Sequence, residues 1–160
     1  MGFDTRVLNN PVSLGRIRAD NNDTVATLST GAAVIANPLV NSSAVYFIGD
    51  GDFLNGYKIY RVPLPGGVGA NPPPLLAGAT PALNQFDGLA VDDTAVYWIN
   101  LAGQLVSCPP AGCSGPPTVL VLNASTASSL TMDSQALYWL VPTYDANFNV
   151  IASSIFRVAR

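Results

Sequence analysis

The fold is decided by the stretch DDTAVYWI at residues 92–99, which recurs as NSSAVYFI at 41–48 and as DSQALYWL at 133–140. In each copy an alanine is followed by valine or leucine, a tyrosine, a second aromatic residue and a branched aliphatic residue. The tyrosines lie 51 and 41 residues apart, a period typical of repeated four-stranded units. Aromatic and β-branched residues favour strands, so each copy predicts a strand and the chain is expected to be all-β.

Further apolar segments around each copy predict a set of short strands. In the middle copy we expect strands at about 88–91, 95–100, 104–107 and 118–122, and the difference between the two periods falls in the loops between strands. The expected organisation is a single domain over residues 1–160. Its blade-like units are assigned to 5–30 (partial), 34–77, 86–122 and 128–158. The chain would then hold about three and a half four-stranded units.

Each copy opens on a residue that favours a tight turn. Asn41, Asp92 and Asp133 occupy this position, and such side chains accept hydrogen bonds from the backbone two residues further on. The two aromatic residues that follow are adjacent, so they point to opposite faces of a strand. We therefore expect both faces to be buried between stacked sheets. A sugar-stacking platform is the alternative interpretation of the aromatic pairs.

The middle unit carries a longer pattern that resembles a known family. It consists of GLAVD at 88–92, VYWIN at 96–100, GQL at 103–105, CPPAGC at 108–113 and PTVL at 117–120. This pattern resembles a blade of secreted bacterial β-propeller repeat proteins, and the resemblance extends over about residues 38–160. It implies a β-propeller-like array of four-stranded antiparallel blades in an exported protein, at the cell envelope or outside the cell. It implies little about activity, because propellers host many functions.

The composition excludes several classes of function. The chain contains no histidine, and all ten of its acidic residues are aspartate, so histidine-based relays and glutamate acid–base pairs are absent. Asp87, Asp92 and Asp93 are close in sequence, but the turn explains Asp92, and we expect no enzyme. Seven basic residues against ten acidic ones give a net charge of −3, which argues against nucleic acid.

The sequence also bears on membranes and on the extent of the chain. It contains no apolar run long enough to predict a membrane-spanning helix. Its first residues lack the pattern of a signal peptide, and we expect the chain to be part of something longer. Because a propeller ring needs about four to eight blades, we expect homo-oligomerisation or a missing propeller segment to complete it.

The two cysteines predict a disulfide. Cys108 and Cys113 flank a four-residue loop, and two cysteines without histidine cannot supply four zinc ligands. Their spacing also differs from the C-x-x-C pattern of redox-active pairs. A small disulfide, formed in an oxidising compartment, is therefore expected.

Two loops carry oxygen ligands that would suit calcium. In these loops aspartate and asparagine alternate with other residues, and the candidates are Asp50, Asp52, Asn55, Asp145, Asn147 and Asn149. Neither loop matches the EF-hand pattern, and neither supplies its bidentate glutamate. We therefore expect ordinary polar turns and no cofactor, with a calcium site as the alternative interpretation.

The sequence favours a non-enzymatic interaction module that presents its inter-strand loops to a protein or glycan partner. Aromatic side chains in these loops would supply rigid contact area; they are Phe53, Tyr57, Tyr144 and Phe148. The alternative is a structural surface protein that self-associates through open blade edges into a closed ring or a fibre. A third possibility is that the chain is a fragment of a propeller enzyme whose active site lies elsewhere.

Overall fold

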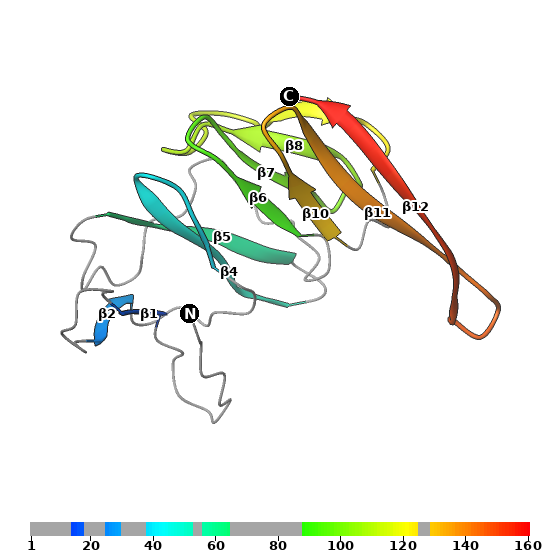
Figure 1. Ribbon diagram of the computed structural model, residues 1–160, viewed down its shortest axis with the longest axis horizontal. Coiled ribbons are helices and arrows are strands. Elements are labelled where there is room, and N and C mark those ends of the chain that lie inside the picture. Colours follow the sequence, from blue (N-terminus) through cyan, green and yellow to red (C-terminus); the bar gives the residue numbers. More distant parts are fainter. Residues whose placement is uncertain (1–13, 18–24, 30–37, 53–55, 65–87, 125–128) are drawn as a thin grey trace.

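The computed structural model describes residues 14–17, 25–29, 38–52, 56–64, 88–124 and 129–160. At 14–17, 25–29, 50–52 and 56–57 it describes the backbone alone. All the regular elements in these ranges are β-strands, so the expected all-β class is confirmed. The strands pair antiparallel into three sheets and a separate N-terminal hairpin (Figure 1). That hairpin consists of β1 (Leu14–Ile17) and β2 (Val25–Ser29).

The three sheets follow the three copies of the sequence pattern. The first sheet contains β3 (Leu39–Val40), β4 (Ala44–Asp52) and β5 (Gly56–Pro63). The second sheet contains β6 (Leu89–Val91), β7 (Val96–Ile99), β8 (Leu105–Cys108) and β9 (Thr118–Val121). The third sheet contains β10 (Ser129–Met132), β11 (Ala136–Tyr144) and β12 (Val150–Ala159). The four strands predicted for the middle unit are thus found, with small differences at their ends.

The strand order within each sheet follows the chain, so each sheet is a meander. Only the second sheet has four strands within the described residues. A fourth strand of the first unit would fall in 65–77, outside the described residues. Asp50 and Asp52, which were predicted to lie in the first inter-strand loop, belong to a strand, because β4 continues to Asp52 before β5 begins at Gly56. A register irregularity between Gly49 and Asp52 lets the hairpin pairing continue into this segment.

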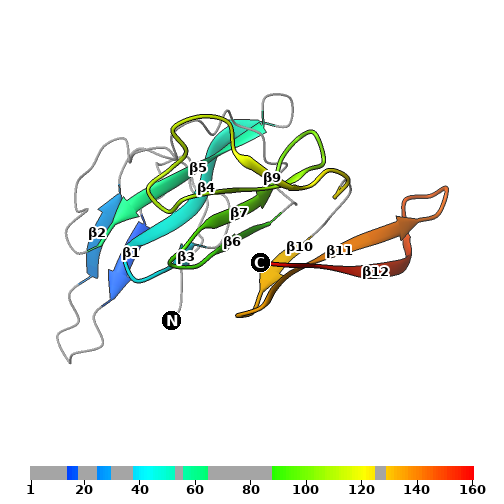
Figure 2. The ribbon, with the colours of Figure 1, turned by 90° about the horizontal axis from the view of Figure 1, so that it is seen from above.

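The sheets stack through their first strands. Strand β6 contacts β3 on one side and β10 on the other. Gly88, just before β6, has a φ of +76°, and a Cβ atom there would lie 2.7 Å from the backbone nitrogen of Leu130. Glycine is required at this position both by the backbone conformation and by the close approach of β10. Figure 2 shows the first two sheets side by side, and the β11–β12 hairpin extending away from them.

Two apolar layers fill the spaces between the sheets. The layer between the first and second sheets includes Tyr46, Ile48, Trp98 and Val106. The layer between the second and third sheets includes Tyr97, Leu105, Leu137 and Trp139. Apolar burial is the main stabilising contribution in such a stack, at about 25 cal/mol per Å² of buried surface.

Candidate functional site

The adjacent aromatic residues lie on opposite faces of their strands, as predicted. In the first sheet Tyr46 faces the second sheet, while Phe47 belongs to a cluster on the far side, where it stacks on Tyr60 at 5.3 Å between ring centroids. In the second sheet Trp98 faces the first sheet and Tyr97 faces the third. These four rings are almost fully buried, which speaks against a sugar-stacking platform on them.

One register position shows how the third sheet differs. Ile59, Leu105 and Ile155 occupy equivalent places, paired with Ile48, Ile99 and Leu140 respectively. Ile59 and Leu105 are 2% and 0% exposed, whereas Ile155 is 74% exposed. The side of the third sheet that faces away from the second sheet is therefore open, and we call it the outer face. It carries Tyr138 and Leu140 of β11, Ile155 and Arg157 of β12, and Ser129 and Thr131 of β10.

The outer face contains an open hollow and a polar cluster. The hollow, of about 330 Å³, is lined by Ser129, Thr131, Tyr138, Trp139, Leu140 and Ile155. At one end of the face the Tyr138 hydroxyl donates a 2.8 Å hydrogen bond to Oδ2 of Asp133. The Arg157 guanidinium lies 5.9 Å from the centre of the Tyr138 ring.

These contacts shift two pKa values. The pKa of Asp133 is lowered from 3.8, first by the backbone N–H of Gln135 and then by the Tyr138 hydroxyl, because both donate to the carboxylate. The same Tyr138–Asp133 hydrogen bond raises the pKa of Tyr138. Near pH 7 Asp133 is therefore charged and Tyr138 is neutral.

The tip of the β11–β12 hairpin holds two of the four predicted contact residues. Tyr144 and Phe148 are 49% and 86% exposed. Phe148 has a φ of 62°, in the left-handed region that residues other than glycine rarely adopt. Its backbone N–H donates to the carbonyl of Asp145 at 3.1 Å, which fixes this conformation. Of the other two predicted contact residues, Phe53 lies outside the described residues and Tyr57 is described by its backbone in β5 alone.

Asp145 organises the same tip. Its Oδ1 accepts hydrogen bonds from the backbone N–H groups of Asn147 and Asn149, at 2.8 and 2.9 Å. The side chain of Asn149 donates to both carboxylate oxygens. The Asn149 bonds, from its side chain and then its backbone, are the main cause of the lowered pKa of Asp145. Three of the predicted calcium ligands, Asp145, Asn147 and Asn149, thus lie together in a hydrogen-bonded turn.

The other predicted calcium ligands are less completely described. Asp50 and Asp52 lie in β4, described by their backbone, and Asn55 lies outside the described residues. Within the described part of the chain, no group of three or more His, Cys, Asp or Glu side chains is placed to hold a metal ion.

The turn-opening residues form the predicted hydrogen bonds and also join the sheets. Oδ1 of Asp92 accepts from the backbone N–H groups of Thr94 and Ala95, and the Asn41 and Asp133 side chains do the same in their turns. Between the first and second sheets, Nδ2 of Asn41 donates to the carbonyl of Asp92 at 2.8 Å. Ser42 lowers the pKa of Asp93, first through its side-chain hydrogen bond and then through its backbone N–H, which donates to Oδ1 of Asp93.

Sequence reasoning missed Arg160, which joins the second and third sheets. Its guanidinium forms an ion pair with Asp92 and donates a hydrogen bond to the carbonyl of Asp133 at 2.7 Å. It also lies 5.8 Å from the centre of the Tyr97 ring. Asp92 cannot donate a hydrogen bond as Asn41 does, and the arginine supplies the missing donor. The difference between asparagine and aspartate at this repeated position was the signal that could have revealed it.

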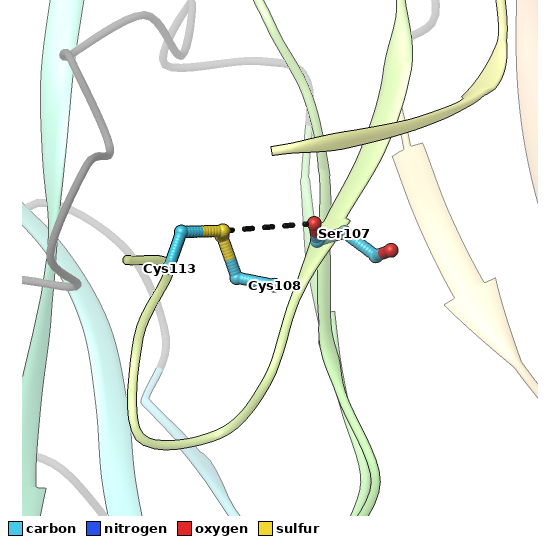
Figure 3. Close-up of a disulfide and its surroundings, with 3 residues drawn as sticks. All are labelled: Ser107, Cys108 and Cys113. Carbon is cyan, nitrogen blue, oxygen red and sulfur yellow. Dashed lines mark hydrogen bonds between the residues drawn. A yellow bond between two sulfur atoms is a disulfide. The ribbon is translucent and has the colours of Figure 1, made fainter. Parts of the chain in front are cut away.

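The disulfide is confirmed. Cys108 and Cys113 are bonded across the loop between β8 and β9, with Cα atoms 5.2 Å apart (Figure 3). Both are buried in the layer between the first and second sheets. The loop also accepts a 2.9 Å hydrogen bond from the Tyr46 hydroxyl at the carbonyl of Pro110. The disulfide therefore shapes a loop that covers the first sheet.

Comparisons with family models, with curated proteins and with solved structures gave no match. In the part of the chain that the structure describes, no helix has the length and apolar character needed to cross a membrane.

Proposed function

We propose that this chain is a non-enzymatic interaction module of an exported bacterial protein, with a β-propeller arrangement of its sheets and a partner bound at the tip of the β11–β12 hairpin. The observation that carries this proposal is Phe148. Its side chain is 86% exposed while its backbone is held at a φ of 62°. The left-handed backbone conformation costs a residue other than glycine about 1–2 kcal/mol. A role of the exposed aromatic side chain in binding would explain why this cost is retained.

The stacking of the sheets supports the propeller arrangement. Propeller blades are four-stranded antiparallel meanders that surround a central channel. Here the sheets are meanders, and their first strands β3, β6 and β10 make the contacts from one sheet to the next. That pattern is expected when the first strand of every blade lies nearest the axis. Further sheets would be needed to close a ring.

The shape and hydrogen bonding of the hairpin support its role in binding. It is longer than the corresponding β7–β8 hairpin of the second sheet, and it extends beyond the stacked sheets (Figure 2). The Asp145 hydrogen bonds order its tip, so little conformational entropy would be lost on binding. Val150 and Ile151 beside the tip are 58% and 64% exposed, and this exposed apolar area favours a protein over a glycan as partner.

Two features support a binding role in place of catalysis. The sequence offers neither histidine nor glutamate as a general acid or base. The carboxylates of Asp92, Asp133 and Asp145 all accept backbone hydrogen bonds in turns, which accounts for them structurally. We propose no resident cofactor, and Asp145 holds the tip through the chain's own donors. The disulfide is compatible with export to an oxidising compartment.

The test separates the binding role of Phe148 from its effect on stability. Phe148→Gly relieves the left-handed strain, so we expect its unfolding midpoint in urea to be no lower than that of the wild type. The same variant, and the double variant Tyr144→Ala/Phe148→Ala, should lose at least about tenfold in affinity for the partner. Partners would be captured by photo-crosslinking from position 148 and tested in parallel on a glycan array.

Leu122→Ala is the matched control. Leu122 is 68% exposed, follows β9 of the second sheet, and should leave partner binding unchanged. Undiminished binding by both hairpin variants, or a crosslinking yield from position 148 no higher than from position 122, would contradict the proposal.

A further inference from the structure

The outer face of the third sheet is exposed, whereas the equivalent faces of the first two sheets are buried. On the first two sheets the equivalent positions are buried by the next sheet: Tyr46 and Ile48 are 0% and 2% exposed, and Tyr97 and Ile99 are 6% and 2% exposed. On the third sheet Tyr138 and Leu140 are half-buried, and Ile155, which pairs with Leu140 beside the hollow, is 74% exposed. A face built to the same apolar pattern therefore lacks its cover.

The far side of the first sheet is buried, unlike the outer face of the third. On the side of the first sheet that faces away from the second sheet, Val45, Phe47, Tyr60 and Val62 form a cluster of side chains that are at most 5% exposed. Head-to-tail addition of chains needs two different open faces, one at each end. Among the sheets whose side chains the structure describes, only the third has an open face, which favours a contact of the outer face with itself.

We propose that the outer face of the third sheet binds the same face of a second copy of this chain, which gives a closed two-fold dimer. A two-fold axis along the central strand β11 keeps the strands of the two sheets aligned, as in aligned sheet packing. It places β12 of each chain over β10 of its partner. Ile155, which is in line with Leu140 and Ser129, then enters the partner's hollow beside Ser129.

The charges on the outer face fit this arrangement. Asp133 and Arg157 lie at the same end of the face, on opposite sides of β11, and both are exposed. Rotation about an axis along β11 exchanges the two sides, so Arg157 of each chain approaches the partner's Asp133. The face is thereby complementary to itself in charge. Opposite charges at such a contact favour the correct register of association.

This inference concerns a surface different from the hairpin tip, so it goes beyond the proposed partner binding. The proposed dimer differs from both assemblies considered from the sequence, the closed ring and the fibre. Open edges in general would allow either a ring or a fibre, but a single self-complementary face stops at two copies.

Sedimentation velocity on the 160-residue chain tests the proposal. We expect a monomer–dimer equilibrium in the micromolar range, without larger species. Ile155→Asp should weaken the dimer at least about tenfold, because it places a carboxylate in an apolar contact. Arg157→Glu should weaken it less, and the wild-type dimer should weaken as salt is raised.

Two control variants locate the contact. Leu122→Asp introduces the same charge at a similarly exposed site of the second sheet and should leave the dimer intact. Phe148→Ala removes the hairpin-tip contact and should also leave it intact, so failure of the tip proposal and failure of this one can be distinguished. Near-ultraviolet circular dichroism of the buried Trp98 and Trp139 would verify that each variant is folded.

Three results would overturn the dimer. They are a monomer at every concentration tested, a species that grows beyond two copies, and a dimer that survives Ile155→Asp in a folded protein. Loss of the dimer in Phe148→Ala would move the contact to the hairpin and overturn the face assignment as well.

Discussion

The second and third sheets share one strand register but differ in what covers them. In both, the tyrosine of the second strand pairs with a residue of the third strand: Tyr97 with Ser107 in one sheet and Tyr138 with Arg157 in the other. Two residues along, Leu105 is fully buried and Ile155 is 74% exposed. The strand sequence thus sets the register and the face on which a side chain lies. Its burial is set by the neighbouring sheet, which the local sequence does not contain.

The largest expected effect is a difference in the free energy of unfolding between the variants Leu105→Ala and Ile155→Ala. Removing the buried Leu105 side chain leaves a cavity between the second and third sheets and should lower the free energy of unfolding by about 2–5 kcal/mol. Ile155→Ala should change it by less than about 0.5 kcal/mol, because the side chain is already in solvent. Urea unfolding, at a concentration low enough to keep the chain monomeric, measures both.

Equal losses of unfolding free energy for the two substitutions would contradict this expectation, since they would mean that Ile155 is buried in the monomer. Leu120→Ala provides a control in the second sheet, because Leu120 is 39% exposed and should behave like Ile155.

The sequence predicted the repeated features of the fold and missed what differs between copies. The turns at Asn41, Asp92 and Asp133 and the opposite faces of the aromatic pairs could be predicted because they depend on local chemistry and on strand alternation. The exposure of Ile155 could not, because its sequence environment resembles that of Ile59 and Leu105. Burial depends on which sheets are present to pack against one another.

The candidate site was predicted in part for the same reason. Tyr144 and Phe148 were predicted because the sequence places them at an inter-strand loop, where side chains are commonly exposed; in the structure Tyr144 ends β11 and Phe148 lies in the turn that follows. The left-handed backbone of Phe148 has no sequence signal, since glycine or asparagine would be the usual residue there. Arg160 was missed because its partners, Asp92 and Asp133, are 68 and 27 residues away in sequence.

The junctions between sheets give a second, smaller comparison. Asn41 donates from its side-chain amide to the second sheet, whereas Asp92 needs Arg160 to bridge to the third. Arg160→Ala should lower the free energy of unfolding by about 1 kcal/mol through the lost hydrogen bond and ion pair. Adding Asp92→Asn should restore most of this loss, because the new amide can donate to the carbonyl of Asp133 and its oxygen can keep the turn.

Urea unfolding of the single and double variants checks this exchange. Asn41→Asp is the mirror control, since it removes the donor at the first junction where the described residues provide no bridging arginine, and it should also cost about 1 kcal/mol. A double variant no more stable than Arg160→Ala would show that the two junctions are not equivalent.

The smallest expected effect concerns the exposed turn of the third sheet. The pKa of Asp133 lies below 3.8 in the folded chain because its carboxylate accepts hydrogen bonds from the Gln135 backbone and from Tyr138. Its contribution to stability is therefore complete above the unfolded pKa and is lost as the pH falls through the lowered folded value. Tyr138→Phe removes one of the three donors to the carboxylate, since the backbone N–H groups of Gln135 and Ala136 remain, so the pKa of Asp133 should rise towards 3.8 without reaching it. Carboxyl-carbon NMR titration measures this shift, and Asp145, whose pKa is lowered mainly by Asn149, should titrate unchanged in the same variant. An unchanged pKa of Asp133 in Tyr138→Phe would show that the tyrosine hydroxyl does not donate to this carboxylate. Tyr138, on the open face of the third sheet, would then not stabilise the turn at Asp133.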